Sequence, residues 1–504
     1  MTSRPKINLA DETLFGNEAA EDENEDIFSA YAYARSEVER FCQPTQPIQI
    51  ARAYKGEGKS ALIRLARIRV SKDQAALTLE TTGPSLSPDI DTTSFEKWVR
   101  EWKVSMVRFV ASEIGSRIGV ALSDDAMALV ELAEQNGFKK RNFISAILDR
   151  LPGQGTEKKR LPPPDPERLL TRWKGTPPAI WMFIDDLDRN FEHSEMSLVR
   201  LAAFFDACRQ IVKTIPTLRF RIAIRPNTWT TLKLRSEALS HVEQYTTVLH
   251  WSEQEMLQLL GRRVEGYLER TGQSHLIDSR LPPSGPERAK GLLEYVFESP
   301  IQWGENTRPV HVALYTLAQH RPRWVIELCR ISARRAAQLG HEKILRADIF
   351  AELLQFGKRR IEDTTAEFRP QCPEIGELLD AFRGQAEQYR TGDLLTLIEN
   401  RITNHINARI VGVANKPTKR QVAAFLFEIG FLFGRRDNSD GSYAHVSYSE
   451  QPSLLASRSD MDSGMTWEIP PVFRQALDLR TSDGSERTRP APSGSGGRRR
   501  RTVR

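Results

Sequence analysis

Long apolar runs, paired cysteines and an apolar leader are all missing from this 504-residue sequence. No stretch approaches the roughly 18 apolar residues that a membrane-spanning helix needs, and the start, MTSRPKINLADETLFG, lacks the apolar core of a secretory signal. The four cysteines, Cys42, Cys208, Cys329 and Cys372, stand singly without CxxC spacing. Neither a zinc site nor a disulfide framework is indicated. We expect a cytoplasmic protein with reduced cysteines and no membrane contact.

Excess positive charge is also scarce outside one segment. The formal net charge is +6, but the segment from Thr481 onward holds seven arginines against two carboxylates and supplies +5 of it. A nearly neutral body argues against a surface that coats nucleic acid, because non-specific affinity comes from clustered phosphate neutralisation. The arginine-rich tail, 481–504, has almost no apolar content and is expected to be disordered. The tail is either a solvated chain end or a segment that binds phosphates.

The composition and length of the chain suffice for several folded domains. Hydrophobic residues make up 39% and charged residues 27%, and the chain is too long for one ordinary core. Changes in apolar periodicity divide it into five parts. They are an acidic N-terminal lead-in helix (1–47), an α/β core (48–250), a helical lid or bundle (251–406), a winged-helix-like α+β domain (407–480) and the tail (481–504).

The core is predicted to contain a parallel sheet, because apolar strands alternate with helical periodicity. The polar, proline-rich stretch 153–164 is interpreted as an exposed loop within this domain. The predicted strands are Ile48–Ala51, Ala179–Ile184 and Arg219–Ile224, and the predicted helices cover Trp98–Leu151 and Leu198–Val212.

A glycine-rich loop lies between the first strand and a helix. Residues Ala53–Ser60, AYKGEGKS, match GxxxxGK[ST] except that alanine holds the first glycine position. Gly56 and Gly58 allow backbone N–H groups to turn inward on phosphates, while Lys59 reaches the terminal phosphates and Ser60 offers a hydroxyl to Mg²⁺. A ligand-free turn is the alternative, but it would need neither the strand before nor the helix after. The expected nucleotide-binding residues are Lys55, Gly56, Glu57, Gly58, Lys59, Ser60 and Ala61.

Acidic residues end the second predicted strand, in IDDLDR. The carboxyl edge of a parallel sheet faces the ligand crevice, so we expect Asp185 to hold Mg²⁺ with Ser60. Asp186 would orient or deprotonate the attacking water. A solvated turn with a helix cap is the alternative, and Asp188 and Arg189 are interpreted as solvated.

Three arginines are candidate phosphate sensors. Arg225 follows the third predicted strand, with Asn227 as a weaker candidate because Pro-Asn is also ordinary turn chemistry. Arg321 and Arg323 flank Pro322 at the start of a helix in the lid, where an arginine could close over a nucleotide. Solvated arginines at a helix start are the alternative.

Together these segments resemble a known family. LFGNEAAEDE, AYKGEGKSAL, MFIDDLDR, IAIRPNTW, LHWSEQEMLQLL and RPRWVIELC are similar to sequences of a bacterial family of P-loop ATPases. That family is similar to the KAP and STAND branches of the AAA+-like NTPases. The resemblance implies an ATP site with Mg²⁺ and a catalytic set of Asp186, Arg225, Arg321 and Arg323. It also implies an ATP-driven switch in bacterial antiphage defence or signalling.

Three functions remain open. The first is an ATPase that acts as a nucleotide-driven switch on a partner protein or on its own assembly. The second is a DNA-binding regulator or loader resembling AAA+ initiators, which would use the winged helix and the basic tail. The third is a P-loop kinase with a small acceptor. The residues do not distinguish ATP from GTP, since no guanine-reading motif is evident and adenine is recognised largely by backbone and apolar contacts, and the family resemblance favours ATP.

Overall fold

The structure is a computed structural model that describes most of the chain. It covers residues 5–33, 35–73, 76–118, 179–189, 191, 194–235, 237–304, 306–437, 443–448, 450–455 and 464–481. The predicted loop at 153–164, the helical stretch beyond residue 118 and the tail from residue 482 lie outside the described residues. In the part that is described, no helix is both long and apolar enough to cross a membrane.

The chain divides into two compact units, and the division falls inside one helix. The first unit comprises Met1–Phe356 with Arg369–Gln371, and the second comprises Gly357–Phe368 with Cys372–Arg504. The predicted domain boundary at 406/407 therefore falls inside the second unit. The reason is that residues 375–398 contribute two helices and a strand to the same small fold as residues 419–474.

A five-stranded parallel sheet forms the centre of the first unit and confirms the predicted α/β core. Its order is β2-β3-β4-β1-β5. The strands are β1 (Ile48–Arg52), β2 (Ala76–Thr82), β3 (Ala179–Asp185), β4 (Leu218–Ile224) and β5 (Thr246–Val248). The polar edge strands β2 and β5 were not predicted, because they lack the apolar runs of the three central strands.

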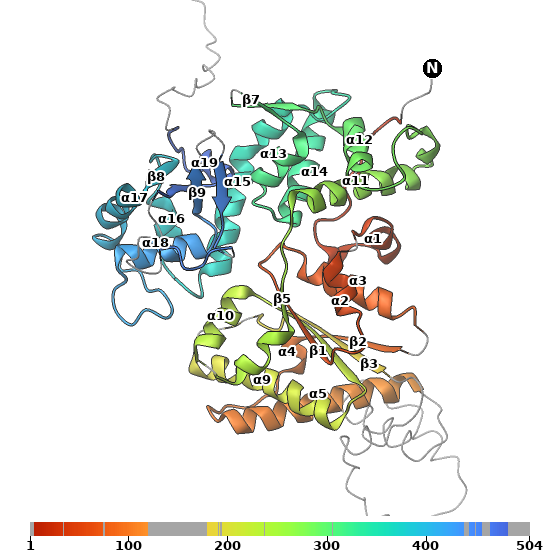
Figure 1. Cartoon of the computed structure of the whole chain (residues 1–504), viewed down its shortest axis with the longest axis vertical. Helices are drawn as coiled ribbons and strands as arrows, with labels where there is room; N and C mark the ends of the chain where they lie inside the picture. Colours follow the sequence, from red (N-terminus) through yellow and green to blue (C-terminus); the bar gives the residue numbers. More distant parts are fainter. Residues whose placement is uncertain are drawn as a thin grey trace, which may run out of the picture. The chain divides into compact units, whose positions relative to one another are not determined.

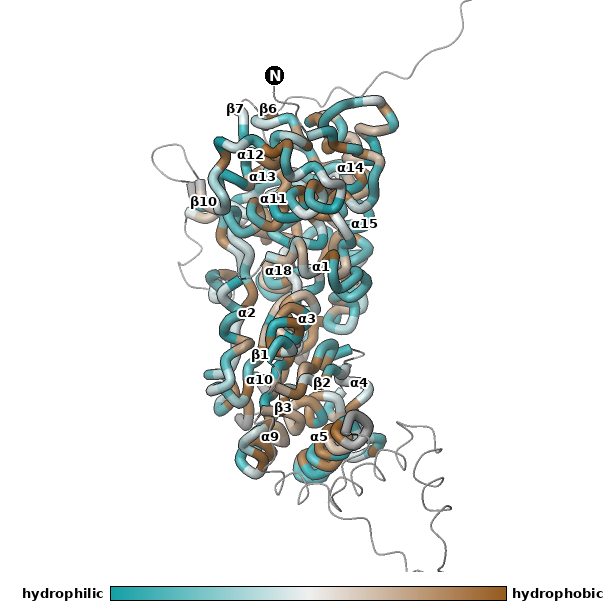
Figure 2. The backbone as a smooth tube through the Cα atoms, turned by 90° about the vertical axis from the view of Figure 1, so that its right-hand side faces the viewer, coloured by the Kyte–Doolittle hydropathy of each residue, from teal (hydrophilic) through white to brown (hydrophobic). Residues whose placement is uncertain are grey.

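Helices cover both faces of this sheet (Figure 1). Alternate strand residues such as Ile50, Met182 and Ile222 pack against α5 (Phe95–Ile118) and α9 (Glu195–Thr214). The intervening residues, such as Ala51 and Phe183, face the cluster that includes α3 (Lys59–Val70). Strands buried on both faces are typical of a parallel sheet. Figure 2 shows polar and apolar segments alternating along α5, as expected for a helix with one covered face.

The predicted lead-in helix is wrong as a single element. The structure has two short helices, α1 (Glu25–Tyr31) and α2 (Ser36–Phe41), separated by extended backbone at Ala32 and Arg35. Both helices bury aromatic residues, so their combined pattern imitates one continuous helix.

A buried arginine fixes the end of α2 to the sheet. Arg221 on β4 is fully buried and donates hydrogen bonds to the carbonyls of Phe41, at the end of α2, and Gln43. Its guanidinium carbon lies 4.4 Å from the ring centroid of Trp181, and burial lowers its pKa to about 9. The side chain therefore remains charged at neutral pH and holds the N-terminal segment against the core.

Helix α10 (Pro226–Arg235) connects β4 to β5. After β5 the first unit continues with helices, as predicted. They are α11 (Glu253–Arg270), α12 (Pro286–Val296), α13 (Val310–Leu317), α14 (Pro322–Gln338) and α15 (Arg346–Phe368), which runs into the second unit. A small hairpin of β6 (Ile301–Trp303) and β7 (Asn306–Arg308) interrupts them and was not predicted.

The second unit combines short helices with an antiparallel sheet in the order β10-β9-β11-β8. Along the chain it contains α16 (Ile375–Asp380), β8 (Gln388–Arg390), α17 (Thr391–Ile398), α18 (Lys419–Glu428), β9 (Phe433–Asp437), β10 (Tyr443–Val446), β11 (Thr466–Glu468) and α19 (Pro471–Arg474). The rings of Phe427 and Trp467 meet edge to face at 5.3 Å in its core. The strands predicted near residues 443 and 466 are present, whereas β8 was assigned to the helical region.

Candidate functional site

A cavity of about 320 Å³ opens at the carboxyl end of β1. It lies where the strand order reverses: the chain leaves β1 between its neighbours β4 and β5 and continues into the distant edge strand β2. In open parallel sheets this switch point is the usual place for a ligand. A volume of this size lies at the lower end of the range for small-molecule sites.

The phosphate loop forms one wall. Gly56 (φ 85°) and Gly58 (φ 94°) both have left-handed backbone that residues with a Cβ rarely adopt. Gly58 is the N-cap of α3, whose first turn begins with Lys59 and Ser60. Backbone N–H groups and the positive end of the helix dipole therefore face the same volume.

Ala53, the departure from the usual glycine, has an ordinary structural explanation. Its side chain is fully buried in the cluster that also contains Ile63 and Leu249. Its backbone is absent from the positive-φ positions of the described residues, so no glycine is required. Its carbonyl accepts a 2.9 Å hydrogen bond from Lys59 Nζ.

The acidic strand end meets this loop. Asp185, the last residue of β3, lies beside the side chain of Ser60, which acts on its pKa as a hydrogen-bond partner, and it accepts a 2.8 Å hydrogen bond from the backbone N–H of Asp186. Burial raises the pKa of the Asp185 carboxyl, while these two hydrogen bonds and the Lys59 charge act in the opposite direction. Asp186 has a left-handed backbone (φ 50°), which turns the chain sharply into the cavity.

Asp188 differs from the solvated residue that the sequence indicated. Its side chain is buried, and Oδ2 accepts hydrogen bonds from the backbone N–H of Arg225 at 3.1 Å and the hydroxyl of Thr228 at 2.8 Å. The Arg225 Nε atom lies 3.8 Å from the same oxygen. Asp188 therefore joins the end of β3 to the end of β4 and fixes Arg225. Arg189 is mostly exposed, with Nη1 4.0 Å from Asp186 Oδ2.

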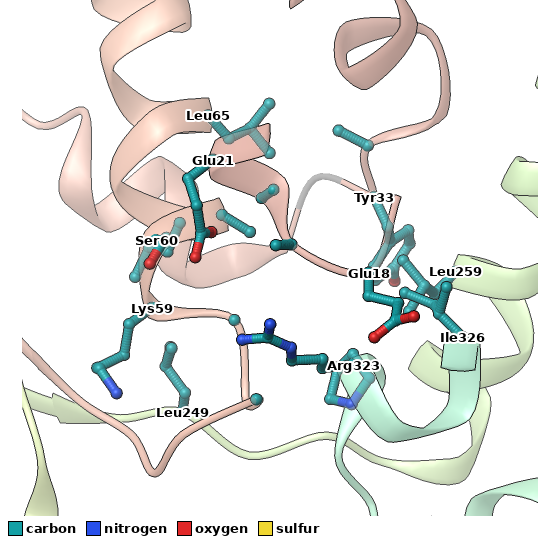
Figure 3. Close-up of a pocket in the computed structure, with 18 of the residues that line it drawn as sticks. Glu18, Glu21, Tyr33, Lys59, Ser60, Leu65, Leu249, Leu259, Arg323 and Ile326 are labelled. Atoms are coloured by element: carbon teal, nitrogen blue, oxygen red, sulfur yellow. The ribbon is translucent and has the colours of Figure 1, made fainter. Parts of the chain in front are cut away.

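The two arginines predicted for the lid, at the start of α14, occupy different places. Arg323 lines the cavity and projects between the Lys59 side and the side formed by Leu259 and Ile326 (Figure 3). Arg321 is buried instead, with its guanidinium carbon 4.4 Å from the Trp324 ring centroid.

The cavity brings together most of the predicted site. The predicted residues that line it are Lys55, Gly56, Gly58, Lys59, Ser60, Ala61, Asp186, Arg225 and Arg323. Glu57, Asp185 and Arg321 do not line it. Asp185 lies against Ser60, and Arg321 donates a hydrogen bond to the Lys55 carbonyl. The Glu57 carboxylate instead accepts a 2.6 Å hydrogen bond from the Tyr54 backbone N–H. Asn227 is buried and is not among the lining residues.

The N-terminal segment forms a wall that the sequence did not indicate. Glu18, Phe28 and Tyr33 line the cavity, and Glu18 forms a 3.0 Å ion pair with Arg330 on α14. Tyr31 donates a 2.8 Å hydrogen bond to Glu23, and burial raises its pKa to about 12. The acidic N-terminal run, followed by Tyr31 and Tyr33, was the feature of the sequence that could have indicated this wall, but only the fold places that segment beside the phosphate loop.

Cationic side chains, including those of Lys59, Arg189, Arg225 and Arg323, line the cavity together with the carboxylates of Glu18, Glu21 and Asp186. Apolar side chains, including Phe28, Leu259 and Ile326, supply another part of the wall. Such a site suits a ligand with a polyanionic end and a flat, largely apolar end.

Comparisons with known proteins give distant structural similarity alone. No protein-family model and no curated protein matches the sequence. The chain is similar to a Walker-type ATPase of Pyrococcus abyssi (12% identity, 88% of this chain and 100% of that chain covered, TM-score 0.38). It is also similar to Cdc6p of Pyrobaculum aerophilum (11%, 91% and 99%, TM-score 0.35) and the ORC2 protein of Aeropyrum pernix (9%, 90% and 96%, TM-score 0.39). All three TM-scores lie below 0.5, so the assignment of a site rests on the geometry above.

Proposed function

We propose that this chain binds ATP in the cavity and hydrolyses it with Mg²⁺. The observation that carries the proposal is the contact between the Ser60 side chain and the Asp185 carboxylate, beside a glycine loop that opens α3. A loop alone explains phosphate binding. A hydroxyl and a carboxylate held together beside it add a site for a cation that accompanies the phosphates.

The donor set fits magnesium. Mg²⁺ prefers oxygen ligands, keeps much of its hydration and is commonly held by one or two protein groups together with substrate phosphates. Ser60 and Asp185 would hold it here. When bound, the ion supplies positive charge that neutralises charge developing on the phosphate oxygens.

The remaining residues supply positioning and charge. Lys59, Arg225 and Arg323 would stabilise the transferring phosphoryl group. Asp186 would orient a water molecule and accept its proton while the water oxygen bonds to the terminal phosphorus. The bond from that phosphorus to the bridging oxygen of ADP then breaks, giving ADP and inorganic phosphate. Arg321, buried behind the loop, would act on this reaction by holding other groups in place.

Removal of the Ser60 hydroxyl tests the metal assignment. For Ser60→Ala we expect the Mg²⁺ concentration for half-maximal phosphate release to rise about tenfold, because one ligand is lost. A chelator should abolish release by the wild type. Ser71→Ala is the matched control, since it removes a hydroxyl bonded at 2.9 Å to a carbonyl at the other end of α3. An unchanged magnesium requirement in Ser60→Ala would refute this assignment, and dependence on an added phosphate acceptor would favour a kinase.

Hydrolysis is proposed to drive a switch. The lid supplies Arg323 to the cavity and the N-terminal segment supplies Glu18. A nucleotide in the cavity would therefore contact the phosphate loop, the lid and the N-terminal segment at the same time. The target would be a partner protein or another copy of the chain. A role in bacterial antiphage defence or signalling is proposed from the sequence resemblance alone.

A DNA-binding regulator resembling AAA+ initiators is the second candidate, and the element order of the second unit favours it. Helix α16, strand β8, helices α17 and α18 and the strands β9 to β11 follow one another as in a winged helix. Arg436 is exposed on β9.

A gel shift distinguishes this candidate from the switch. If the second unit binds DNA, chains with and without residues 481–504 should both retard duplex DNA, and binding should weaken steeply as salt rises. If DNA binding is lost when residues 481–504 are removed, the tail supplies the affinity. Absence of binding by either chain would leave the protein-directed switch as the proposal.

A further inference from the structure

Three successive carbonyls on the outer side of the phosphate loop are each held by a donor from elsewhere in the chain. In order, the carbonyls of residues 55, 56 and 57 accept hydrogen bonds from Arg321 Nη1 at 3.3 Å, the Arg323 backbone N–H at 3.2 Å and Trp251 Nε1 at 2.8 Å. We call these three hydrogen bonds the carbonyl clamp. Two of its donors come from the start of α14, and the third comes from the residue that follows β5 by a short connection.

The clamp acts on the direction of the loop's N–H groups. A trans peptide holds its carbonyl and the following N–H on opposite sides of the chain. Fixing the carbonyls of Lys55 and Glu57 outward therefore directs the N–H groups of Gly56 and Gly58 away from the clamp. Both glycines line the cavity. Glycine-rich backbone is conformationally free, so hydrogen bonds that restrict it reduce the entropy lost when phosphates bind.

Trp251 occupies the centre of this arrangement. The Arg35 guanidinium carbon lies 4.3 Å from its ring centroid, and its ring comes within 3.8 Å of the position that a Cβ on Gly58 would take. Its own carbonyl accepts a 2.8 Å hydrogen bond from the Tyr315 hydroxyl on α13. One side chain thus contacts the N-terminal segment and the phosphate loop, and its backbone contacts the lid.

The lid side of the clamp carries strained backbone. Tyr315 stacks on His320 with ring centroids 4.0 Å apart. Gln319 (φ 49°) and His320 (φ 63°) are consecutive non-glycine residues in the left-handed region, directly before Arg321. Backbone of this kind persists only where surrounding contacts hold it, and it clusters at sites that bind or switch.

We propose that Trp251 is a positioning residue that orients the phosphate loop for nucleotide and links the loop to the lid through Tyr315. This inference rests on the proposed function, because it concerns the same cavity. It assigns to Trp251 an effect on nucleotide affinity although the residue need not touch the reacting phosphate. Because the clamp acts on the loop before chemistry, its loss should weaken nucleotide binding more than it slows the chemical step.

Trp251→Phe tests this, with Trp102→Phe as a matched control. Trp102 is also buried and its Nε1 also donates a 2.8 Å hydrogen bond to a carbonyl, that of Arg200, but it is not among the cavity-lining residues. Both variants lose one indole hydrogen bond and keep a ring, so the two nucleotide-free proteins should melt at similarly reduced temperatures. For Trp251→Phe alone we expect the Kd and KM for MgATP to rise about tenfold while kcat changes less than about twofold.

A second variant keeps the test decisive if Trp251→Phe does not fold. Tyr315→Phe removes only the hydroxyl that bonds the Trp251 carbonyl, and it should raise the Kd in the same direction by a smaller factor. If the wild type binds MgATP and Trp251→Phe binds it as tightly as Trp102→Phe does, the role of Trp251 is overturned. Where Trp251→Phe does not fold, wild-type affinity in Tyr315→Phe overturns it. If the wild type binds no nucleotide, the proposed function fails and this inference fails with it.

Discussion

Lys59→Ala should lower phosphate release from MgATP at least about 100-fold, because it removes the charge that the phosphate loop directs at the terminal phosphates. In the structure Lys59 Nζ bonds to the Ala53 carbonyl at the start of the same loop, so the ammonium is already held beside the cavity. The substitution should also weaken nucleotide binding. Phosphate release and equilibrium binding of MgATP, both measured on the purified chain, check the two parts of the prediction.

The control for this substitution lies just past the end of the same helix. Lys72→Ala removes an exposed lysine that follows α3 and should leave both release and binding near wild-type values. Hydrolysis by Lys59→Ala at the wild-type rate would show that the activity belongs to another site or to a contaminant. The central assignment would then be wrong.

The sequence predicted the phosphate-loop side of the cavity because that side is local. The phosphate loop lies between one strand and one helix, and its glycines, lysine and serine are consecutive residues whose geometry follows from neighbouring backbone. Asp185 and Arg225 could be placed on the same edge for a similar reason. Both end buried apolar strands, and the carboxyl ends of parallel strands share one edge.

The other side could not be predicted, because long-range packing creates it. Trp251 is one tryptophan among nine in the sequence, and nothing local to it indicates a hydrogen bond to Glu57. Asp188 and Asp186 are alike in the sequence, yet one is buried behind Arg225 and the other lines the cavity. Arg321 and Arg323 lie two residues apart, but the helix start turns one behind the loop and the other into the cavity.

Asp186→Asn should separate binding from hydrolysis. The amide keeps the size of the side chain and its place at the left-handed turn, since asparagine tolerates this backbone as aspartate does. It removes the carboxylate that would accept a proton from the attacking water. Loss of such a base lowers rates by about 100-fold to 10,000-fold, so we expect phosphate release to fall into that range. Binding of MgATP should remain within a few-fold of the wild type, in contrast to Lys59→Ala.

A variant that binds but does not hydrolyse also tests the switch. If ATP drives association of the chain with itself, Asp186→Asn should accumulate in the associated state, and light scattering should report a larger mass with MgATP than with ADP. The matched control is Asp206→Asn, on the partly exposed side of α9, where the carboxylate contacts Arg209. Undiminished hydrolysis by Asp186→Asn would exclude this carboxylate as the base. Slow hydrolysis without any change in mass would keep the ATPase assignment and would indicate that the switch acts on a partner protein rather than on self-association.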